Sequence, residues 1–316
     1  MRRLICLFFL LLGIGQLSAQ TIIELKPGGV VRNKTVEDYK EEQKIQERER
    51  DDSVAYVDDL RRAFNALHVD SLQEAERLFI EAIKLRPHAP GNHVVRYNLA
   101  LIDFARGHYA KAVDKLNEIL KTFPNYVDAR IARAEAELQM GREHEAIRDA
   151  DFLLEQTLPD ADQAELHQQA LFIRAAARYR LHRYDEARID LSRLLKEKPE
   201  HENAMVLEAL TLLKMGRPRE SLERLNRIVS MFPNSREALI TRAQVQTELE
   251  MYVLARADYD TLIERYPQAP ELYVERAKIL IRLKEKNAAR QDLDSAVRLG
   301  VSHGEVQIFY QLLRKM

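Results

Sequence analysis

The chain has 316 residues, of which 46% are hydrophobic and 31% are charged, and its formal net charge at pH 7 is −1. A charge so close to zero gives no general attraction to nucleic acid or to an anionic membrane surface. Only 10 glycines and 10 prolines occur, about half of their usual combined share, so residues that break helices are rare. This composition favours a helical protein without a nucleic-acid partner.

Residues 1–19 have the order of a secretory signal peptide: two arginines, an apolar run over residues 4–14, and small residues at Ser18 and Ala19. We expect cleavage after Ala19, export across the inner membrane, and a soluble periplasmic product that is not inserted in the membrane. Eleven apolar residues are too few for an uncleaved anchor, because a spanning helix needs roughly 20. Cys6 is the only cysteine, so cleavage would leave no disulfide, thiolate ligand or cysteine nucleophile.

Residues 20–55 form a charged segment before the first repeat. Residues 21–31, TIIELKPGGVV, contain two short β-prone runs around a turn. Residues 36–52 are so charged that they predict either a solvated helix or a disordered linker, and we expect the linker. An alternative is that the apolar side chains of residues 21–31 occupy a groove, on the same chain or on a neighbouring copy.

Seven units of similar length then follow, and each contains two short helices with apolar periodicity. They cover residues 56–87, 93–124, 127–159, 168–199, 202–233, 236–267 and 270–301. The eighth position is always alanine, at Ala63, Ala100, Ala134, Ala175, Ala209, Ala243 and Ala277. The twentieth is small, at Ala75, Ala112, Ala146, Ala187, Ser221, Ala255 and Ala289. Small residues at both places allow the two helices of a unit to approach closely.

This spacing resembles the tetratricopeptide repeat, a helix–turn–helix unit of 34 residues. The resemblance implies an all-α fold, a right-handed superhelical solenoid of seven repeats. Residues 302–316 would cap the last repeat, with Val306, Phe309, Leu312, Leu313 and Met316 on its apolar face. The family's turn glycine is replaced by Asp70, His182, Glu250 and Lys284 in four repeats, which is tolerable if those turns do not need a positive φ.

Two insertions interrupt the period. Residues 88–92 lengthen the loop after repeat one, and residues 160–167 precede repeat four. The second insertion is helix-compatible, so we expect the first helix of repeat four to be two turns longer than the others, with Asp160 or Asp162 as its cap.

Charges covary within the repeats. The seventh position is arginine where the twenty-third is aspartate, and repeat five has the charges exchanged. We therefore expect a structural salt bridge between the two helices of each such repeat, since buried charges are paired. The predicted pairs are Arg133 with Asp149, Arg174 with Asp190, Glu208 with Arg224, Arg242 with Asp258, and Arg276 with Asp292.

In the tetratricopeptide family, positions two, five, nine, twelve and thirteen of each repeat face the concave groove. Transferred to this sequence, these positions predict an apolar groove in the amino-terminal half: Leu60, Phe64, Leu67, Tyr97, Leu101, Phe104, Ile131, Leu138, Phe172, Tyr179, Val206 and Leu210. The carboxy-terminal part presents Gln244, Thr247, Glu248, Glu271, Lys278 and Arg282 instead. Some of the apolar side chains could equally pack between repeats, because a stripe at helical spacing is usually core.

No catalytic motif, phosphate-binding loop, cofactor site or metal site is apparent; His88 and His93 form only a weak loop pair for a metal. We therefore expect a non-catalytic scaffold of the bacterial cell envelope that binds a peptide or helical segment of a partner protein in the groove. The alternative is self-association, with residues 20–55 of one copy filling the groove of another. An enzyme with an unrecognised site is the third hypothesis.

Overall fold

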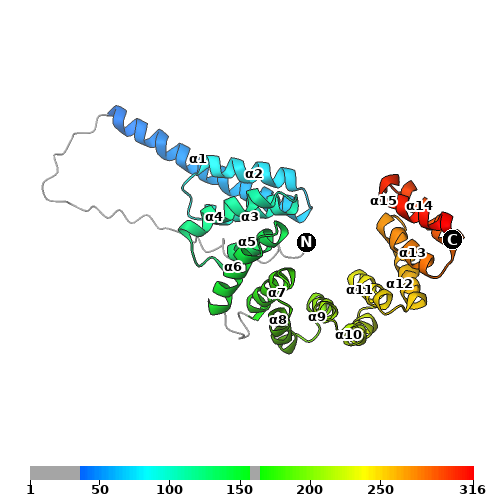
Figure 1. The fold of residues 1–316 in the computed structure, drawn as a ribbon. Helices are drawn as coiled ribbons and strands as arrows, with labels where there is room; N and C mark the ends of the chain where they lie inside the picture. Colours follow the sequence, from blue (N-terminus) through cyan, green and yellow to red (C-terminus); the bar gives the residue numbers. More distant parts are fainter. Residues whose placement is uncertain (1–35, 157–163) are drawn as a thin grey trace. The chain divides into compact units, whose positions relative to one another are not determined.

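The computed structural model describes residues 36–156 and 164–316, and every regular element in these two ranges is an α-helix (Figure 1). The predicted signal peptide, residues 21–31, and the predicted caps Asp160 and Asp162 lie outside the described residues. Within the described ranges, none of the helices combines the length and the apolar character that crossing a bilayer would require.

Fifteen helices occur in the described residues, and most are 13 or 14 residues long. They are α1 (Val36–His68), α2 (Leu72–Leu85), α3 (Asn92–Ala105), α4 (Tyr109–Thr122), α5 (Val127–Gln139), α6 (Glu143–Gln156), α7 (Ala164–Arg180), α8 (Tyr184–Glu197), α9 (Glu202–Lys214), α10 (Pro218–Met231), α11 (Arg236–Glu248), α12 (Tyr252–Arg265), α13 (Pro270–Arg282), α14 (Lys286–Arg298) and α15 (His303–Lys315).

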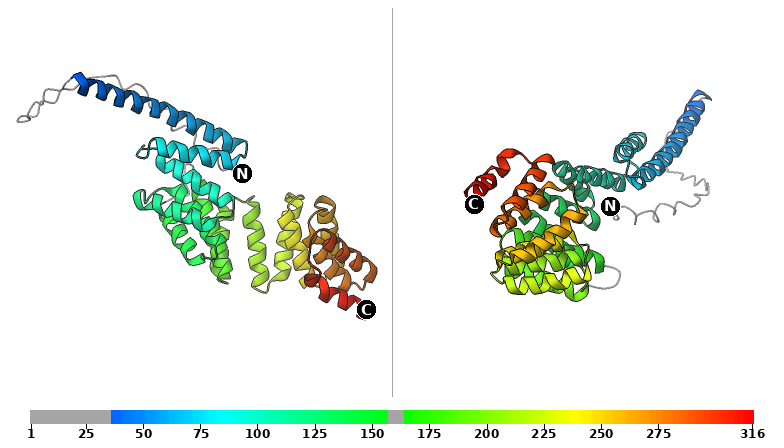
Figure 2. Two further views of the ribbon diagram at one scale, coloured as in Figure 1. Left: turned by 90° about the horizontal axis from the view of Figure 1, so that it is seen from above. Right: turned by 90° about the vertical axis from the view of Figure 1, so that its right-hand side faces the viewer.

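The chain divides into two compact units, residues 1–136 and 137–316, and the division falls inside α5. In the first unit α2 packs on α1, α3 on α2, and α4 on α3. In the second unit consecutive helices from α6 to α15 pack on one another (Figure 2). Such nearest-neighbour packing is the arrangement of a solenoid, in which each repeat buries apolar surface only against its neighbours.

The alanine pattern has a direct structural cause. All seven residues at the eighth position and all seven at the twentieth are fully buried, with 0% exposed surface. In repeat five the hydroxyl of Ser221 donates a hydrogen bond of 2.7 Å to the carbonyl oxygen of Ala209, which places the two positions in contact. Larger side chains at these positions would push the paired helices apart or force neighbouring side chains out of their preferred rotamers.

Helix α1 starts 20 residues before Tyr56, where the first repeat was expected to begin. The charged stretch is therefore a solvated helix and not the disordered linker that we expected, and its side chains over residues 43–52 are exposed. Its later part joins the first unit, because Tyr56 is buried and donates a hydrogen bond of 3.1 Å to Asn92. Asn92 in turn donates to the carbonyl oxygens of Arg86 and Pro87, which fixes the inserted loop.

The turns between paired helices correct one expectation. Asp70, His182, Glu250 and Lys284 have φ values between 58° and 61°, close to those of the turn glycines Gly107, Gly141 and Gly216. The turn thus needs a left-handed residue in every repeat. A side chain in this conformation costs roughly 1–2 kcal/mol relative to glycine, so four repeats carry backbone strain.

Two further helix predictions concern α7 and α15. The described part of α7 has 17 residues, about one turn more than α9, α11 and α13, and the residues expected to extend it further lie outside the described ranges. In α15 Val306 and Leu313 are buried and Phe309 is partly buried, but Leu312 and Met316 are about half exposed. The predicted apolar face of α15 is therefore divided between a buried side and an exposed side.

Candidate functional site

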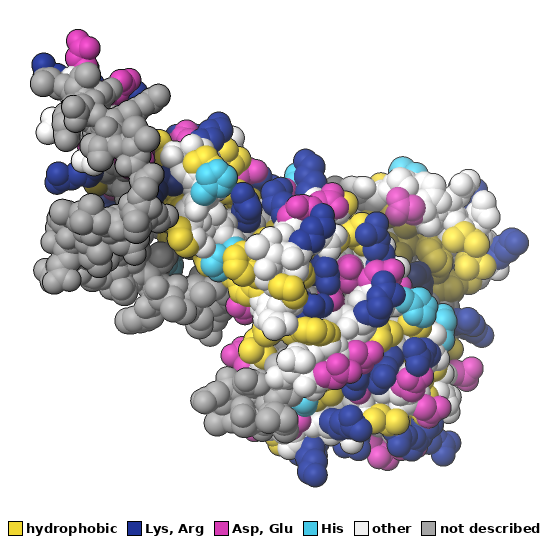
Figure 3. Space-filling model, turned by 90° about the vertical axis from the view of Figure 1, so that its left-hand side faces the viewer, with side chains coloured by type: hydrophobic (Ala, Val, Ile, Leu, Met, Phe, Trp, Pro, Cys, Tyr) yellow, Lys and Arg dark blue, Asp and Glu magenta, His cyan; other side chains and the backbone are white. Residues whose placement is uncertain are grey.

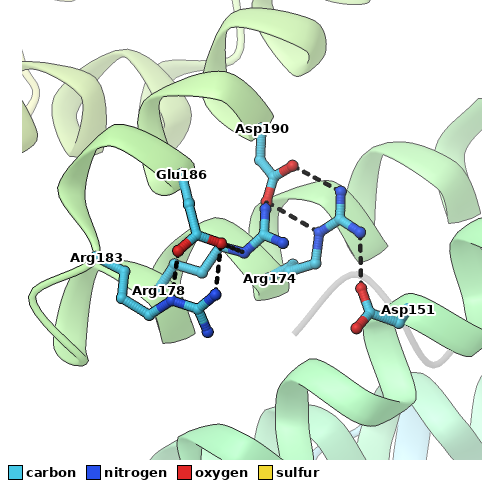
Figure 4. A network of polar contacts seen from close by, with 6 residues as sticks. All are labelled: Asp151, Arg174, Arg178, Arg183, Glu186 and Asp190. Carbon is cyan, nitrogen blue, oxygen red and sulfur yellow. Dashed lines mark hydrogen bonds and ion pairs between the residues drawn. The ribbon is translucent and has the colours of Figure 1, made fainter.

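Arginine side chains link neighbouring helices along the stack. In repeat four Arg174 donates two hydrogen bonds to Asp190, from Nε at 2.9 Å and from Nη2 at 2.7 Å (Figure 4). A third, from Nη1 to Asp151, is 2.7 Å long and reaches the second helix of the preceding repeat. Burial opposes the charge of Arg174, but the hydrogen bonds to Asp190 and Asp151 raise its pKa above the ordinary value.

Asp190 itself is completely buried and accepts a further hydrogen bond of 2.6 Å from Nη1 of Arg178. Figure 4 shows both guanidinium groups directed at this carboxylate, with Glu186 between Arg178 and Arg183. Two cations around one buried anion are tolerable because Asp151 and Glu186 supply the additional negative charge.

The same arrangement recurs in repeats six and seven. Arg242 binds Asp258 at 2.8 and 2.5 Å, and Arg276 binds Asp292 at 2.8 and 2.7 Å. Each arginine also reaches the preceding repeat, at Asn226 (3.3 Å) for Arg242 and at Asp260 (2.7 Å) for Arg276.

Sequence reasoning missed these inter-repeat partners, although a signal was present. They all occupy the twenty-fifth position of their repeats: Asn117, Asp151, Asn226 and Asp260. Asn117 accepts a hydrogen bond of 2.7 Å from Arg133. We call this series of arginines with its acceptors on both sides the arginine ladder.

The remaining two predicted pairs stand differently. Glu208 and Arg224 are 3.8 Å apart and Arg224 is 55% exposed, so their contact is loose and solvated. Arg133 belongs to the first unit and Asp149 to the second, and this pair stays a prediction. Repeat two, which lacks the arginine, has an ion pair between Lys115 and the buried Asp103 instead.

The predicted groove residues fall into two groups by exposure. Leu60, Leu67, Ile131, Leu138 and Val206 are buried, with at most 9% of their surface exposed, so they contribute to packing between helices. The others are partly exposed: Phe64, Tyr97, Leu101, Phe104, Phe172, Tyr179 and Leu210. Only this second group offers surface to a partner.

The partly exposed rings are each held by a second ring. Tyr97 lies 5.4 Å from Tyr126, measured between ring centroids, and Phe104 lies 5.2 Å from Tyr109. In the second unit Phe172 stacks on His201 at 5.5 Å and Tyr179 meets Tyr184 at 5.7 Å. Phe64 similarly contacts Phe79 edge-on at 5.2 Å. Desolvation by burial raises the pKa of Tyr179 above its ordinary value and that of Tyr126 to about 12.

The carboxy-terminal positions are polar and largely exposed. Gln244, Glu248, Glu271 and Arg282 are exposed, whereas Thr247 and Lys278 are half-buried. Glu271 accepts a hydrogen bond of 2.6 Å from Arg236, and Lys278 lies 2.6 Å from Glu275. Figure 3 draws the left-hand side of Figure 1, and on that face cationic and anionic side chains are interspersed with hydrophobic ones.

The one metal site considered from the sequence was the loop pair of His88 and His93. No group of three or more His, Cys, Asp or Glu side chains with metal-site geometry occurs within residues 36–156 and 164–316. His93, which had been considered with His88, has its Nδ1 at 2.9 Å from the carbonyl oxygen of Pro90 and its ring 4.5 Å from that of Phe123.

Comparisons with known proteins agree with this architecture. A tetratricopeptide-repeat family model matches residues 97–157, 206–270 and 252–300. A search of curated protein sequences found no significant match. A tetratricopeptide repeat protein from Parabacteroides merdae ATCC 43184 is 22% identical with a TM-score of 0.67, covering 82% of this chain and 99% of that one.

Two further solved structures have related folds. PilW, described as a widely conserved type IV pilus biogenesis factor, is 15% identical with a TM-score of 0.60, over 71% of this chain and 98% of its own. PilF from Pseudomonas aeruginosa is 19% identical with a TM-score of 0.55, and the alignment covers 69% of this chain and 96% of PilF. At these identities the similarity concerns the fold alone. The family match and the stacked helix pairs together identify the chain as a tetratricopeptide-repeat protein.

Proposed function

We propose that this protein is a non-catalytic scaffold of the bacterial cell envelope, which binds a segment of another protein along the first helices of its repeats. Solenoids of this kind generally use such surfaces for protein partners. The observation that carries the proposal is the set of partly exposed aromatic rings at groove-facing positions: Tyr97, Phe104, Phe172 and Tyr179.

These rings have the properties of binding anchors. An aromatic side chain offers a large contact area and loses only two torsional freedoms when it is fixed. Here each ring already rests against a second one, at 5.2 to 5.7 Å, so part of that ordering has occurred before any partner binds. Packing between repeats alone would not require aromatic surface to remain accessible.

Two observations support the location in the envelope. Residues 1–19 have the charged, apolar and small-residue order of a secretory signal. PilW, which has a similar fold, is described as a pilus biogenesis factor, and this is compatible with an envelope protein. We do not extend the pilus role itself to this chain, because that similarity is one of fold.

The proposal is tested by chemical cross-linking in intact cells, followed by purification of the chain and identification of its cross-linked partners. The test variant combines Phe104→Ser with Tyr179→Ser, one groove-facing ring in each unit. The matched control combines Ile80→Ser with Ile189→Ser, two exposed apolar residues on second helices, again one in each unit. We expect the wild type and the control variant to recover one or a few cross-linked envelope proteins. The test variant should recover at least tenfold less of these proteins.

Equal recovery with both double variants would refute binding at the groove-facing rings. A cross-linked product that contains only copies of this chain, and is lost on deletion of residues 20–55, would replace the proposal with self-association. Circular dichroism of each variant verifies that the helices are retained.

A further inference from the structure

Helix α15 has an exposed apolar stripe that its role as a cap does not explain. Ile308, Leu312 and Met316 follow one another at intervals of four residues and are 58%, 44% and 45% exposed. The buried side of α15, with Val306 and Leu313, packs on α13 and α14. The stripe is therefore additional to the surface that closes the stack.

A hydrogen bond fixes the register of α15 relative to the repeats. Tyr310 donates a bond of 2.6 Å to Asp294, the twenty-fifth position of repeat seven, in the way that Arg276 donates to Asp260. If α15 is numbered as an eighth first helix, Tyr310 takes its seventh position and Gly304 its first. In this register Ile308, Leu312 and Met316 occupy positions five, nine and thirteen, which are groove-facing positions.

The same register shows where a second helix would pack if the stack continued. Positions eight and eleven are buried in repeat seven, at Ala277 and Leu280, but they are the exposed polar residues Gln311 and Arg314 in α15. The end of the stack is therefore closed by polar side chains. The apolar stripe does not lie on that closed face, so a missing repeat does not explain it.

The stripe continues a row that runs across the second unit. We define the fifth-position row as Phe172, Val206, Ile240, Val274 and Ile308, one residue from each first helix from α7 to α15. Among these helices α7 lies beside α9, α9 beside α11, and α13 beside α15. All five residues are apolar, and exposure rises from the buried Val206 to the half-exposed Ile308. Sequence reasoning missed the last three, because it judged this part of the surface by its polar positions.

The charges beside this row are unequal on its two sides. The side towards the carboxyl ends of the helices carries the cationic side chains Lys214, Lys278, Arg282 and Lys315 and the exposed acid Glu248, and Lys278 is paired with Glu275 at 2.6 Å. On the other side lie the acids Glu237, Glu271 and Glu305, of which Glu271 is paired with Arg236. The row therefore runs between a mainly cationic side and a mainly acidic side.

We propose that the partly exposed members of the fifth-position row and the exposed stripe of α15 bind an apolar segment of another protein that places acidic side chains on the flank facing the cationic side. The apolar residues supply burial, and the cationic side chains select the acidic flank and set the direction of the segment. This inference rests on the proposed scaffold function and specifies the chemistry of its partner.

The test uses a display library of random 15-residue peptides selected on the immobilised full chain, with affinities of selected peptides measured by fluorescence anisotropy. One test variant is Ile308→Asp, whose control is Ile189→Asp on α8, a residue with 53% exposure. The other combines Lys278→Glu with Arg282→Glu, and its control combines Arg188→Glu with Arg193→Glu, two exposed arginines on α8.

We expect selected peptides to be enriched in Asp and Glu among apolar residues. Their affinity should fall at least tenfold with either test variant and less than twofold with either control, and the charge variant should reduce the salt dependence of binding. Failure to select any peptide, absence of acidic enrichment, or affinities insensitive to Ile308→Asp would overturn the inference. If the native partners of the previous section are still recovered in that case, the scaffold function stands and only the partner chemistry is wrong.

Discussion

Repeats four and five have the same architecture but stabilise it differently. In repeat four the fully buried Asp190 holds Arg174 and Arg178, whereas in repeat five Glu208 and the exposed Arg224 approach only to 3.8 Å. The turn of repeat four uses His182 at φ 59°, and that of repeat five uses Gly216 at φ 74°. Covarying charges thus identify which residues face each other, but burial decides how much free energy their contact contributes.

The largest effect is expected from Asp190→Asn. It leaves two arginines with side chains only 13% and 16% exposed without their shared carboxylate. Removing one partner of a buried ion pair costs about 3–5 kcal/mol, so the free energy of unfolding should fall by that amount. Urea denaturation measures the loss, with the exposed Asp185→Asn on the same helix as control. A loss of under about 1 kcal/mol would show that the ladder is not a major support of the stack.

Exchanging the turn residues should have the next largest effect. Gly216→Ala places a Cβ in open space but at a positive φ, so it should destabilise by roughly 1–2 kcal/mol through the backbone alone. The reciprocal His182→Gly should stabilise by less than about 1 kcal/mol, because it also loses the contact of 2.7 Å with the Tyr184 hydroxyl. Thermal unfolding of both variants measures these effects. If Gly216→Ala left stability unchanged, the positive φ of this turn would carry no strain.

Arg224→Ala should cost at most about 1 kcal/mol, since exposed ion pairs contribute little. The charge exchange of Glu208→Arg with Arg224→Glu should accordingly be close to neutral. A double-mutant cycle measured by urea denaturation gives the coupling energy directly. Coupling above about 2 kcal/mol would mean that this pair is as important as the buried one in repeat four.

The smallest effect concerns pH. Burial raises the pKa of Tyr179 in the folded chain, and repeat five contains no tyrosine. A phenol whose folded pKa is raised contributes stability that is fully present below its unfolded value near 10 and is lost as the pH rises through the folded value. The melting temperature should therefore fall less between pH 9 and pH 11 for Tyr179→Phe than for the wild type. Identical pH profiles would contradict the assignment.

The sequence was sufficient to predict the repeat period and the close helix pairs. Alanine at the eighth position and a small residue at the twentieth recur in all seven repeats, and this pattern indicates pairs of closely packed helices. It could not give the length of α1, because the charged and exposed residues 43–52 at its beginning have no apolar periodicity to measure. It also failed at the turns: a positive φ is invisible when histidine or lysine occupies the position.

For the candidate site the sequence predicted on which face of a helix each residue lies, but not how deeply its side chain is buried. Leu60 and Phe64 share the same predicted surface, yet Leu60 is buried and Phe64 is partly exposed, since exposure depends on the neighbouring helix. The inter-repeat acceptors of the ladder, such as Asp260, were missed for a similar reason, because their partners lie 16 to 23 residues away in the next repeat. Ile308 was missed because α15 was treated as a cap and not as a groove-facing helix.

The central claim is that the partly exposed groove-facing rings on the first helices bind a partner, whereas exposed apolar residues on the second helices do not. Site-specific photo-cross-linking in living cells tests it most directly, with a benzophenone amino acid placed at Tyr179 or at Ile189, both in repeat four. The account predicts a discrete adduct with another envelope protein from position 179 and none from position 189. Equal labelling from both positions, or labelling from position 189 alone, would contradict it.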